Sequence, residues 1–165
     1  MIRKKKLYVG PKKLYEKTRI AEENDLMKKY ALKSKREIWK SESKINYYRS
    51  RAKALAKSSS EEQNVLFEKL TALGIKVDSI ADVLALKIEN LLDRRLPTIV
   101  AKKGLSTTPQ HARQLIVHKK VAINGNIVNS PSYIVAISEE NAITVKQAAK
   151  PKEAKKVENA PEVAQ

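Results

Sequence analysis

Paired cations between residues 94 and 120 are the side chains in this sequence best suited to chemistry. Adjacent basic residues occur there three times, and Arg113 and His118 lie between the second and third pairs. The set is Arg94, Arg95, Lys102, Lys103, Arg113, His118, Lys119 and Lys120. Guanidinium and ammonium groups donate charge-assisted hydrogen bonds to phosphate oxygens, so the set predicts binding to a phosphate-bearing polymer. The alternative interpretation is a solvated helix face for the pairs and a solvated surface side chain for His118.

The sequence offers no arrangement typical of catalysis or of a metal site. It contains no cysteine, no glycine-rich phosphate loop, no HExxH helix and no serine in a nucleophile elbow. His111 and His118 are the only histidines, and no further ligands stand near them in the sequence. Asp93 could act as a base, but its neighbours Arg94 and Arg95 favour an ion pair instead. We expect no enzymatic activity, no cofactor and no metal.

Positive charge is concentrated at the front of the 165-residue chain, whose net charge is +16. Residues 1–57 carry a net charge of +13, residues 58–89 one of −3, and residues 90–147 one of +5. Such self-repulsion is best tolerated when a polyanion neutralises it, so the front third predicts a second contact surface for nucleic acid. The candidate contacts in this part are Arg3, Lys4, Lys5, Lys6, Lys12, Lys13, Arg49, Arg51 and Lys53.

Signals for membrane insertion or export are absent from the sequence. No apolar run approaches the roughly 20 residues that a helix needs to cross a bilayer, and the start MIRKKKLYVG lacks the apolar core of a signal peptide. The hydrophobic content of 42% predicts a real but limited core. We expect a cytoplasmic protein without membrane contact.

A helix is expected to carry the first cation pairs. Leu92, Leu96 and Ile99 recur at helical spacing and predict a buried stripe. The opposite, positive side of that helix is predicted to hold Arg94, Arg95, Thr98 and Lys102. Pro97 removes a backbone hydrogen bond inside this stretch, so we expect a kink or a restart there.

A second helix is expected to carry Arg113 and to lead into the last cations. The residues Thr107, Thr108 and Pro109 predict its start, and Gln110 completes a capping box with Thr107. Its buried side is predicted to consist of Ala112, Leu115 and Ile116, with the polar side chains, Arg113 and His118 among them, spread over the other side.

A small antiparallel sheet follows in the sequence pattern. Asn124-Gly125 tolerates positive backbone φ and predicts a hairpin between strands at residues 121–123 and 127–128. Ile137 and residues 142–145 are expected to add a further strand. Residues 148–165 repeat Ala, Lys, Glu and Pro, and we expect a disordered tail there.

The front of the chain is predicted to be helical after a basic arm. Residues 1–17 show no sustained period, which is typical of an extended arm that orders on RNA. Residues 18–89 are predicted to form a helical lobe, and residues 90–147 the separate small domain. Within the lobe, helices are expected near 19–30, from Ser34 to about Lys57, from Ser59 to Gly74, and at 77–89 with Ile80, Val83, Leu84 and Ile88 on one face.

Local sequence patterns in this lobe also suggest helix caps and aromatic contacts. Ser34 with Glu37, and Ser59 with Glu62, have the spacing of capping boxes. Trp39 is expected to pack, with stacking on an unpaired base as the alternative. The adjacent Tyr47 and Tyr48 face different ways on a helix, so one is predicted in the core and the other at a contact surface.

The ordered motifs RRL, STTPQHARQLI, H, NG and PSY between residues 94 and 133 resemble the RNA-binding domain named after ribosomal small-subunit protein four, in its archaeal and eukaryotic form. The resemblance extends over most of the chain to about Lys146. It implies an α+β fold: a helical front lobe plus a small domain of two helices on a short antiparallel sheet, with a flexible basic arm and a disordered tail. Two departures are Pro97 in the first domain helix and Lys119-Lys120, where relatives often have a glycine.

The same resemblance implies a function. It implies a monomeric structural protein that binds small-subunit ribosomal RNA, acts early in assembly of the subunit body, lies beside small-subunit protein five and supports decoding accuracy. The alternative is a free regulatory or quality-control RNA-binding protein that uses the domain on ribosomes, tRNA or mRNA. An enzyme fragment is disfavoured, since too little chain remains for a catalytic domain.

Overall fold

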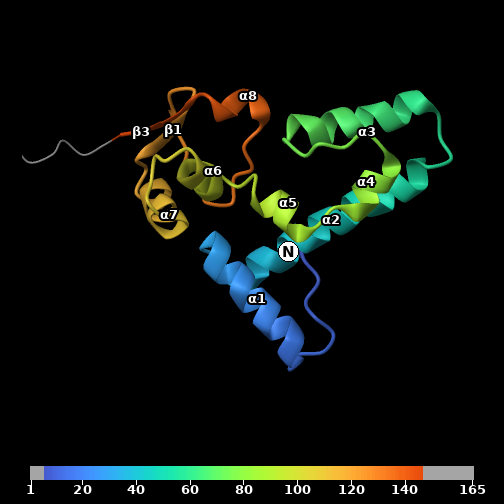
Figure 1. The fold of residues 1–165 in the computed structure, drawn as a ribbon, viewed down its shortest axis with the longest axis horizontal. Helices are drawn as coiled ribbons and strands as arrows, with labels where there is room; N and C mark the ends of the chain where they lie inside the picture. Colours follow the sequence, from blue (N-terminus) through green and yellow to red (C-terminus); the bar gives the residue numbers. More distant parts are fainter. Residues whose placement is uncertain (1–5, 147–165) are drawn as a thin grey trace, which may run out of the picture.

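Eight helices and three short strands follow one another in residues 6–146, the part that the computed structural model describes (Figure 1). The elements are α1 (Lys17–Tyr30), α2 (Lys35–Leu55), α3 (Ser60–Ala72), α4 (Ile80–Ala85), α5 (Ile88–Leu92), α6 (Leu96–Lys102), α7 (Pro109–Val117), β1 (Val121–Ile123), β2 (Asn126–Ile127), α8 (Ile137–Glu140) and β3 (Ile143–Val145). The predicted α+β fold class is confirmed. The candidate contacts Arg3, Lys4 and Lys5 and the predicted tail lie outside the described residues.

The sheet has the strand order β2-β1-β3, and both pairings are antiparallel. Asn124 and Gly125 have φ values of 50° and 80°, as a two-residue hairpin with positive φ at both positions requires. The predicted hairpin is therefore confirmed. β3 also matches the expected strand, but Ile137 begins the short helix α8 and its side chain is exposed, so its predicted place in a strand is wrong.

Helices α6 and α7 pack on one another and on this sheet to form the core of the second half of the chain. Leu96, Val100, Ile116, Val121 and Val135 are fully buried in that core. Leu115, which was expected to lie in the core, is only partly buried at its edge. The long segment between β2 and α8 returns to α6, where the backbone N–H of Leu96 donates to the carbonyl of Tyr133.

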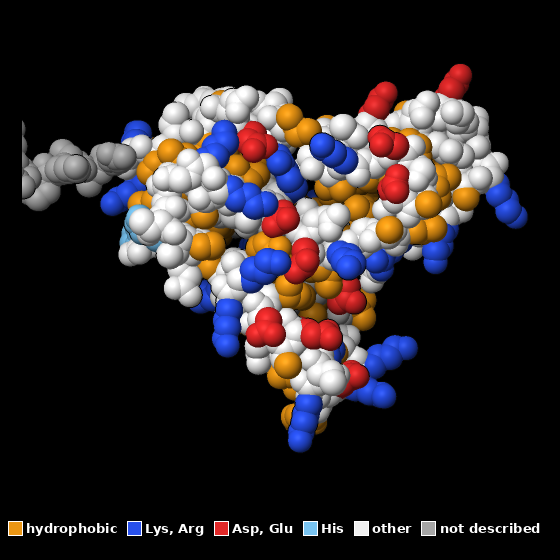
Figure 2. All heavy atoms as spheres, viewed as in Figure 1, with side chains coloured by type: hydrophobic (Ala, Val, Ile, Leu, Met, Phe, Trp, Pro, Cys, Tyr) orange, Lys and Arg blue, Asp and Glu red, His pale blue; other side chains and the backbone are white. Residues whose placement is uncertain are grey.

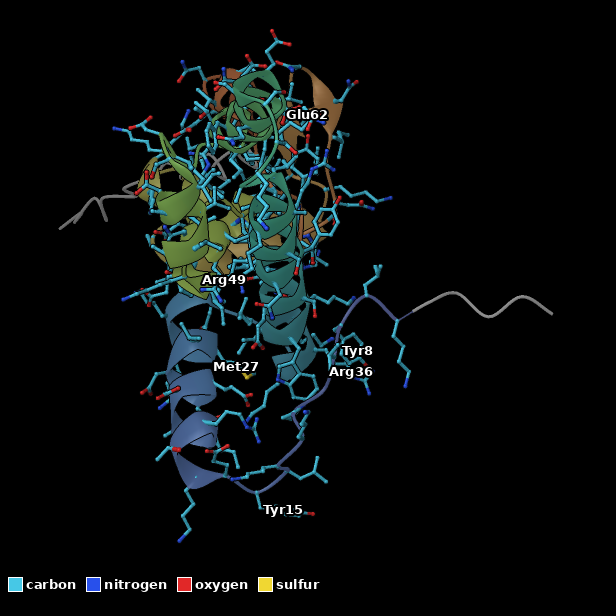
Figure 3. All side chains as sticks on the ribbon, turned by 90° about the vertical axis from the view of Figure 1, so that its right-hand side faces the viewer. Tyr8, Tyr15, Met27, Arg36, Arg49 and Glu62 are labelled. Atoms are coloured by element: carbon cyan, nitrogen blue, oxygen red, sulfur yellow. The ribbon has the colours of Figure 1, made fainter. Side chains whose placement is uncertain are left out.

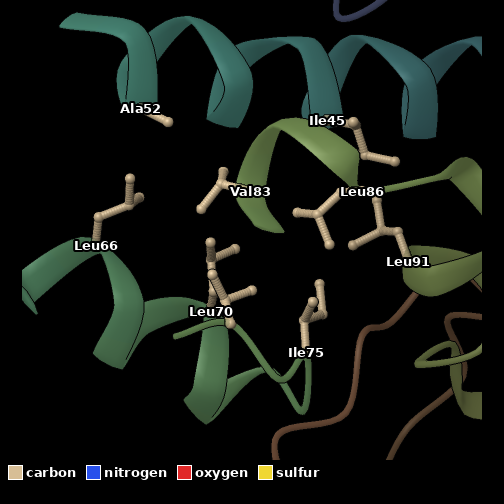
Figure 4. Close-up of a cluster of buried hydrophobic side chains, with 9 residues drawn as sticks. Ile45, Ala52, Leu66, Leu70, Ile75, Val83, Leu86 and Leu91 are labelled. Atoms are coloured by element: carbon tan, nitrogen blue, oxygen red, sulfur yellow. The ribbon is translucent and has the colours of Figure 1, made fainter. Parts of the chain in front are cut away.

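Helix α2 is the central element of the front half, because α1, α3, α4 and α5 all contact it (Figure 1). Its apolar side chains recur at the predicted helical spacing, and Ile45 and Ala52 are buried. Figure 4 shows these two side chains facing Leu66 and Leu70 of α3 and Val83 of α4 across one apolar cluster. The long predicted helix beginning at Ser34 is thus confirmed.

The segment before α1 runs alongside α2 (Figure 3). The backbone N–H of Val9 donates to Ser43 Oγ at 3.2 Å, and the Tyr8 ring lies 6.0 Å from that of Trp39. Trp39 Nε1 also donates to Glu23 at 3.0 Å, so the predicted packing role of Trp39 is confirmed. Residues 6–16 contain no helix or strand, as expected for the basic arm.

Two predicted helices are interrupted. The helix expected at 77–89 breaks after Ala85, so that Leu84 is exposed while Leu86 is buried. A second break separates α5 from α6, and Pro97 occupies the first turn of α6. The expected restart at Pro97 is confirmed, because proline fits the first turn of a helix but not its interior. The predicted positive side shared by Arg94, Arg95, Thr98 and Lys102 is wrong, because Arg95 and Thr98 are buried.

The helix caps differ from the predicted ones. Thr108, and not Thr107, caps α7 by accepting from the N–H of His111 at 3.2 Å. A full capping box occurs instead at Ser79 and Asp82 before α4. Gly74 ends the α3 turn at a φ of 82°, as predicted. Within residues 6–146, no helix has the length and apolar character needed to span a bilayer.

The side chains of Ser34 and Ser59 precede α2 and α3 but accept no capping hydrogen bond. Glu37, the expected partner of Ser34, reaches the N–H of Lys33 at 3.3 Å and otherwise faces the second half of the chain. The capping boxes predicted at these two sites are therefore wrong. Serine and glutamate at this spacing permit the motif but do not exclude a stronger distant partner for the carboxylate.

Candidate RNA-binding surface

Arg95 lies between α5 and α6, where the chain turns, and its residue is only 5% exposed. Its Nη2 atom donates to Glu37 Oε2 in α2 at 2.5 Å and to the carbonyl of Pro131 at 3.3 Å. The backbone of Arg95 also forms an antiparallel bridge with Ile134. The RRL and PSY motifs therefore meet in space, and the predicted solvent-facing position of Arg95, like that of the buried Thr98, is wrong.

Arg113 projects from α7 toward the same carboxylate. Its Nη2 atom lies 3.0 Å from Glu37 Oε1, and its Nη1 atom donates to the carbonyl of Ala31 at 3.2 Å. Burial alone would raise the pKa of Glu37, but hydrogen bonds from Arg113 and Arg95 outweigh burial and hold that pKa below its ordinary value. Glu37 is thus an ionised carboxylate that joins α2 to both domain helices, and the open polar position expected for Arg113 is wrong.

Arg94 is also held inside the protein. Its Nη1 atom pairs with Glu140 of α8 at 2.9 Å, and its Nη2 atom donates to the carbonyl of Val135 at 3.0 Å. The guanidinium lies against Gly74, where an added Cβ would come within 2.5 Å of the Arg94 side chain. Arg94 therefore connects the end of α3 to the segment around α8, on the side of the chain that was expected to be free.

Asp93 does not form the expected ion pair with a neighbouring arginine. Its carboxylate accepts from the hydroxyl of Tyr30 at 3.1 Å and lies 3.4 Å from Lys102 Nζ. Burial, together with the charge of Asp93 and its hydrogen bond, raises the pKa of Tyr30 to about 12. Tyr30 and Asp93 thus form a polar contact between α1 and the segment before α6, in addition to the contacts that Glu37 makes from α2.

Five of the predicted site residues lie exposed at the ends of the two domain helices: Lys102, Lys103, His118, Lys119 and Lys120. Lys102 and Lys103 end α6, and Lys103 Nζ also donates to the carbonyl of Glu140. Lys119 has a φ of 58°, the left-handed conformation that a glycine would adopt without strain. The turn after α7 therefore has a backbone conformation that favours glycine although Lys119 stands there, and it presents two adjacent lysines to solvent.

The candidate RNA-binding residues of the front third also divide into exposed and partly buried side chains. Lys6, Lys12, Lys13, Arg51 and Lys53 are exposed. Arg49 is half-buried, and its Nη2 atom donates to the carbonyl of Leu86 at 2.6 Å. Tyr48 packs against the front core, as predicted for one member of this pair, and Tyr47 is 57% exposed. On the face shown in Figure 2, acidic side chains lie among basic ones, so this face is not uniformly positive.

Sequence reasoning missed Glu37 as a connecting residue and Lys40 and Lys44 as part of the basic surface. Lys40 and Lys44 are one turn apart on α2 and line a hollow together with Glu37 and Arg95. Their spacing of four was a usable signal, because residues i and i+4 share a helix face. Within residues 6–146, no group of three metal-ligating side chains comes together.

The S4 domain model matches residues 94–141, which contain α6, α7 and the β1–β2 hairpin, so the protein has an S4 domain. Similarity extends well beyond the domain. Small ribosomal subunit protein uS4 of Methanococcus aeolicus is 42% identical over 84% of this chain and 82% of its own length. The uS4 proteins of Methanocella arvoryzae and Hyperthermus butylicus are 40% and 41% identical, over 85% and 84% of this chain and 75% and 82% of their own lengths. The chain belongs to the uS4 family.

Proposed function

We propose that this protein is a structural constituent of the small ribosomal subunit and binds small-subunit ribosomal RNA directly. The observation that carries the proposal is the similarity to proteins named for that subunit, which spans both halves of the chain and not the S4 domain alone. The net charge of +16 supports it, because neutralising phosphates removes the self-repulsion of such a chain.

The proposed mechanism is positional and includes no catalytic step. The exposed lysines at the ends of α6 and α7 neutralise phosphates of folded RNA, and the basic side chains of the arm and α2 hold a neighbouring RNA segment. Glu37, Arg95 and Arg113 keep the two contact surfaces in a fixed relation. RNA helices bound at both surfaces would then be held at one angle.

Finer features of the proposal come from the family resemblance. They are early binding during assembly of the subunit body, support of decoding accuracy, a position beside small-subunit protein five, and presence as one monomer per subunit in the cytoplasm. The fixed relation between the two surfaces supports an assembly role, since a rigid protein can offset the ordering cost of an RNA junction with its own binding energy.

The proposal is tested by purifying small subunits from the source cells and washing them at high salt. We expect about one copy of the protein per subunit to remain after the wash. A protein that leaves the subunits at high salt, or that is present in far less than one copy, is instead a regulatory or quality-control factor.

RNA titrations test the electrostatic part of the mechanism. If roughly six to ten phosphates are contacted, affinity for small-subunit RNA falls by about three to five orders of magnitude between low and moderately raised salt. Changing Lys119 and Lys120 together to glutamine should make the log–log slope shallower by roughly 0.7 to 0.9 for each phosphate that is no longer neutralised. A slope close to zero for the unaltered protein would exclude binding through phosphates.

A further inference from the structure

A small hollow lies at the junction of the two halves of the molecule, beside the Glu37–Arg95 ion pair. Its volume is about 210 Å³, and it is lined from α2 by Glu37, Lys40, Ser41 and Lys44, and from the rest of the chain by Leu91, Arg95, Ser132 and Ile134. Because one water takes about 30 Å³ in the liquid, the hollow has room for a phosphate group together with waters.

The charges around this hollow are strongly unbalanced. Lys40, Lys44 and Arg95 contribute three positive charges, and the lining carboxylate of Glu37 is shared between Arg95 and Arg113. Among residues 6–146, no carboxylate lies within ion-pair distance of Lys40 or Lys44. The two lysines therefore have charge to offer a ligand, whereas the carboxylate is already neutralised.

Arg95 and Lys44 both carry donors that no described residue accepts. Its Nη2 atom bonds to Glu37, while its Nη1 atom is buried and has no acceptor among the described residues. Lys44 is partly buried, and this burial lowers the pKa of its ammonium group. A partly buried ammonium group without an acceptor is costly, and an anionic oxygen in the hollow would remove that cost for Lys44.

We propose that this hollow is a binding site for a phosphate group of the RNA backbone, held by Lys40 and Lys44 beside the positive charge of Arg95, with the hydroxyl of Ser132 as a further donor. The inference rests on the proposed RNA-binding function and adds a specific contact to it. The site lies between the two halves, so one phosphate held there touches α2 and the start of α6 at the same time.

An exposed aromatic side chain next to the hollow favours RNA over a free anion. Lys40 and Lys44 also line a neighbouring hollow of about 330 Å³ with Leu7, Ser43 and Tyr47. Tyr47 is 57% exposed, and an exposed ring beside a phosphate site is a platform on which a base can stack. A nucleotide whose phosphate occupies the site could therefore place its base, or the next one, on Tyr47.

The test compares the full-length protein with the double variant Lys40→Gln/Lys44→Gln and a matched control, Lys28→Gln/Lys69→Gln. The control removes the same charge from exposed positions on α1 and α3. Binding to small-subunit RNA transcribed in vitro should weaken by roughly 10- to 100-fold for the site variant. The control should change the affinity by less than about threefold, since distant surface charges are screened.

A second experiment measures the effect of inorganic phosphate on thermal stability at constant ionic strength. The variant Tyr47→Ser distinguishes a site for RNA from a site for free phosphate. Phosphate should raise the melting temperature of the unaltered protein and of the control but not of Lys40→Gln/Lys44→Gln, because only an intact site gains from binding. Tyr47→Ser should weaken RNA binding and leave the response to phosphate unchanged. Thermal melts without ligand confirm that each variant folds.

Three outcomes overturn the proposal or its basis. If the unaltered protein does not bind the RNA, the proposed function itself fails. If it binds, but the site variant and the control bind equally and respond equally to phosphate, only the phosphate site fails. If phosphate stabilises the protein through the site while RNA affinity is unaffected by either Lys40→Gln/Lys44→Gln or Tyr47→Ser, the hollow takes a free anion and not RNA.

Discussion

Arg95 donates a hydrogen bond to Glu37 at a distance of 2.5 Å, although the two residues are 58 positions apart in the sequence. Arg95 lies at the start of α6, and Glu37 lies in the first turn of α2. Arg113 reaches the second oxygen of the same carboxylate at 3.0 Å. One ionised side chain between two guanidinium groups therefore joins the front helices to the S4 domain, in addition to the contacts that Tyr30 and Arg94 make. Its removal affects both halves of the protein.

Changing Glu37 to glutamine should destabilise the protein by about 3 to 5 kcal/mol, because it leaves the buried charge of Arg95 without a counter-charge. Chemical denaturation at neutral pH measures this loss. Glu42→Gln is the matched control, since Glu42 is exposed on the same helix and its change should alter stability by less than about 0.5 kcal/mol. Equal effects of the two changes would show that the shared carboxylate is dispensable.

The stability that Glu37 contributes should depend on pH in one direction. Its pKa in the folded protein lies below the ordinary value of 4.5, so its contribution is complete above that pH and is lost as the pH falls through the lowered pKa. The difference in unfolding free energy between the unaltered protein and Glu37→Gln should thus be constant near neutral pH and shrink in acid. Denaturation curves from about pH 7 to about pH 3 measure it, and a difference that grew in acid would contradict the ion pair.

Gly74 and Arg94 should behave as a coupled pair. Gly74→Ala should lower the free energy of unfolding by about 1 to 2 kcal/mol, because a residue with a side chain is strained in the left-handed conformation. The loss should be larger here, because the new Cβ meets the Arg94 side chain. Gly104→Ala is the control: its φ is also positive, at 71°, but nothing lies within 4 Å of its added Cβ. In a double-mutant cycle, Arg94→Ala should reduce the cost of Gly74→Ala but leave that of Gly104→Ala unchanged.

Ile116→Ala should cost about 2 to 5 kcal/mol, because Ile116 is fully buried between α7 and the sheet. Leu115→Ala, one position earlier and partly exposed, should cost less. Per folded molecule, neither change should alter RNA affinity. Paired thermal melts and RNA titrations separate folding from binding, and a loss of affinity in fully folded Ile116→Ala would mean that this part of α7 also contributes to the RNA contact.

The sequence predicted those elements that depend on near neighbours in the chain. The apolar spacing along α2, the Asn124-Gly125 hairpin and the left-handed end of α3 at Gly74 each follow from a few adjacent residue types. The restart at Pro97 follows from the chemistry of one ring. The short break at Leu86 was missed because a regular apolar pattern continues across it.

The surroundings of the arginines could not be predicted in the same way. Glu37 is 58 residues from Arg95 and 76 from Arg113, and the chain has 18 acidic side chains that could each have been the partner. A helical wheel shows only that an arginine side chain lies off the apolar stripe. It cannot show that the other half of the protein covers that side chain. The exposed lysines after α6 and α7 were easier, because both pairs lie where a helix ends.

The carboxylate of Glu37, which Arg95 and Arg113 share, limits how the S4 domain can be transferred to another protein. Residues 94–141 match the S4 domain model, yet a fragment cut at residue 90 would lack the acid that neutralises Arg95 and Arg113. Grafted onto another protein, that fragment would bring two unpaired guanidinium groups to its junction, and a host that offered no carboxylate there would bind it poorly. The portable unit is therefore larger than the domain and includes the first turn of α2.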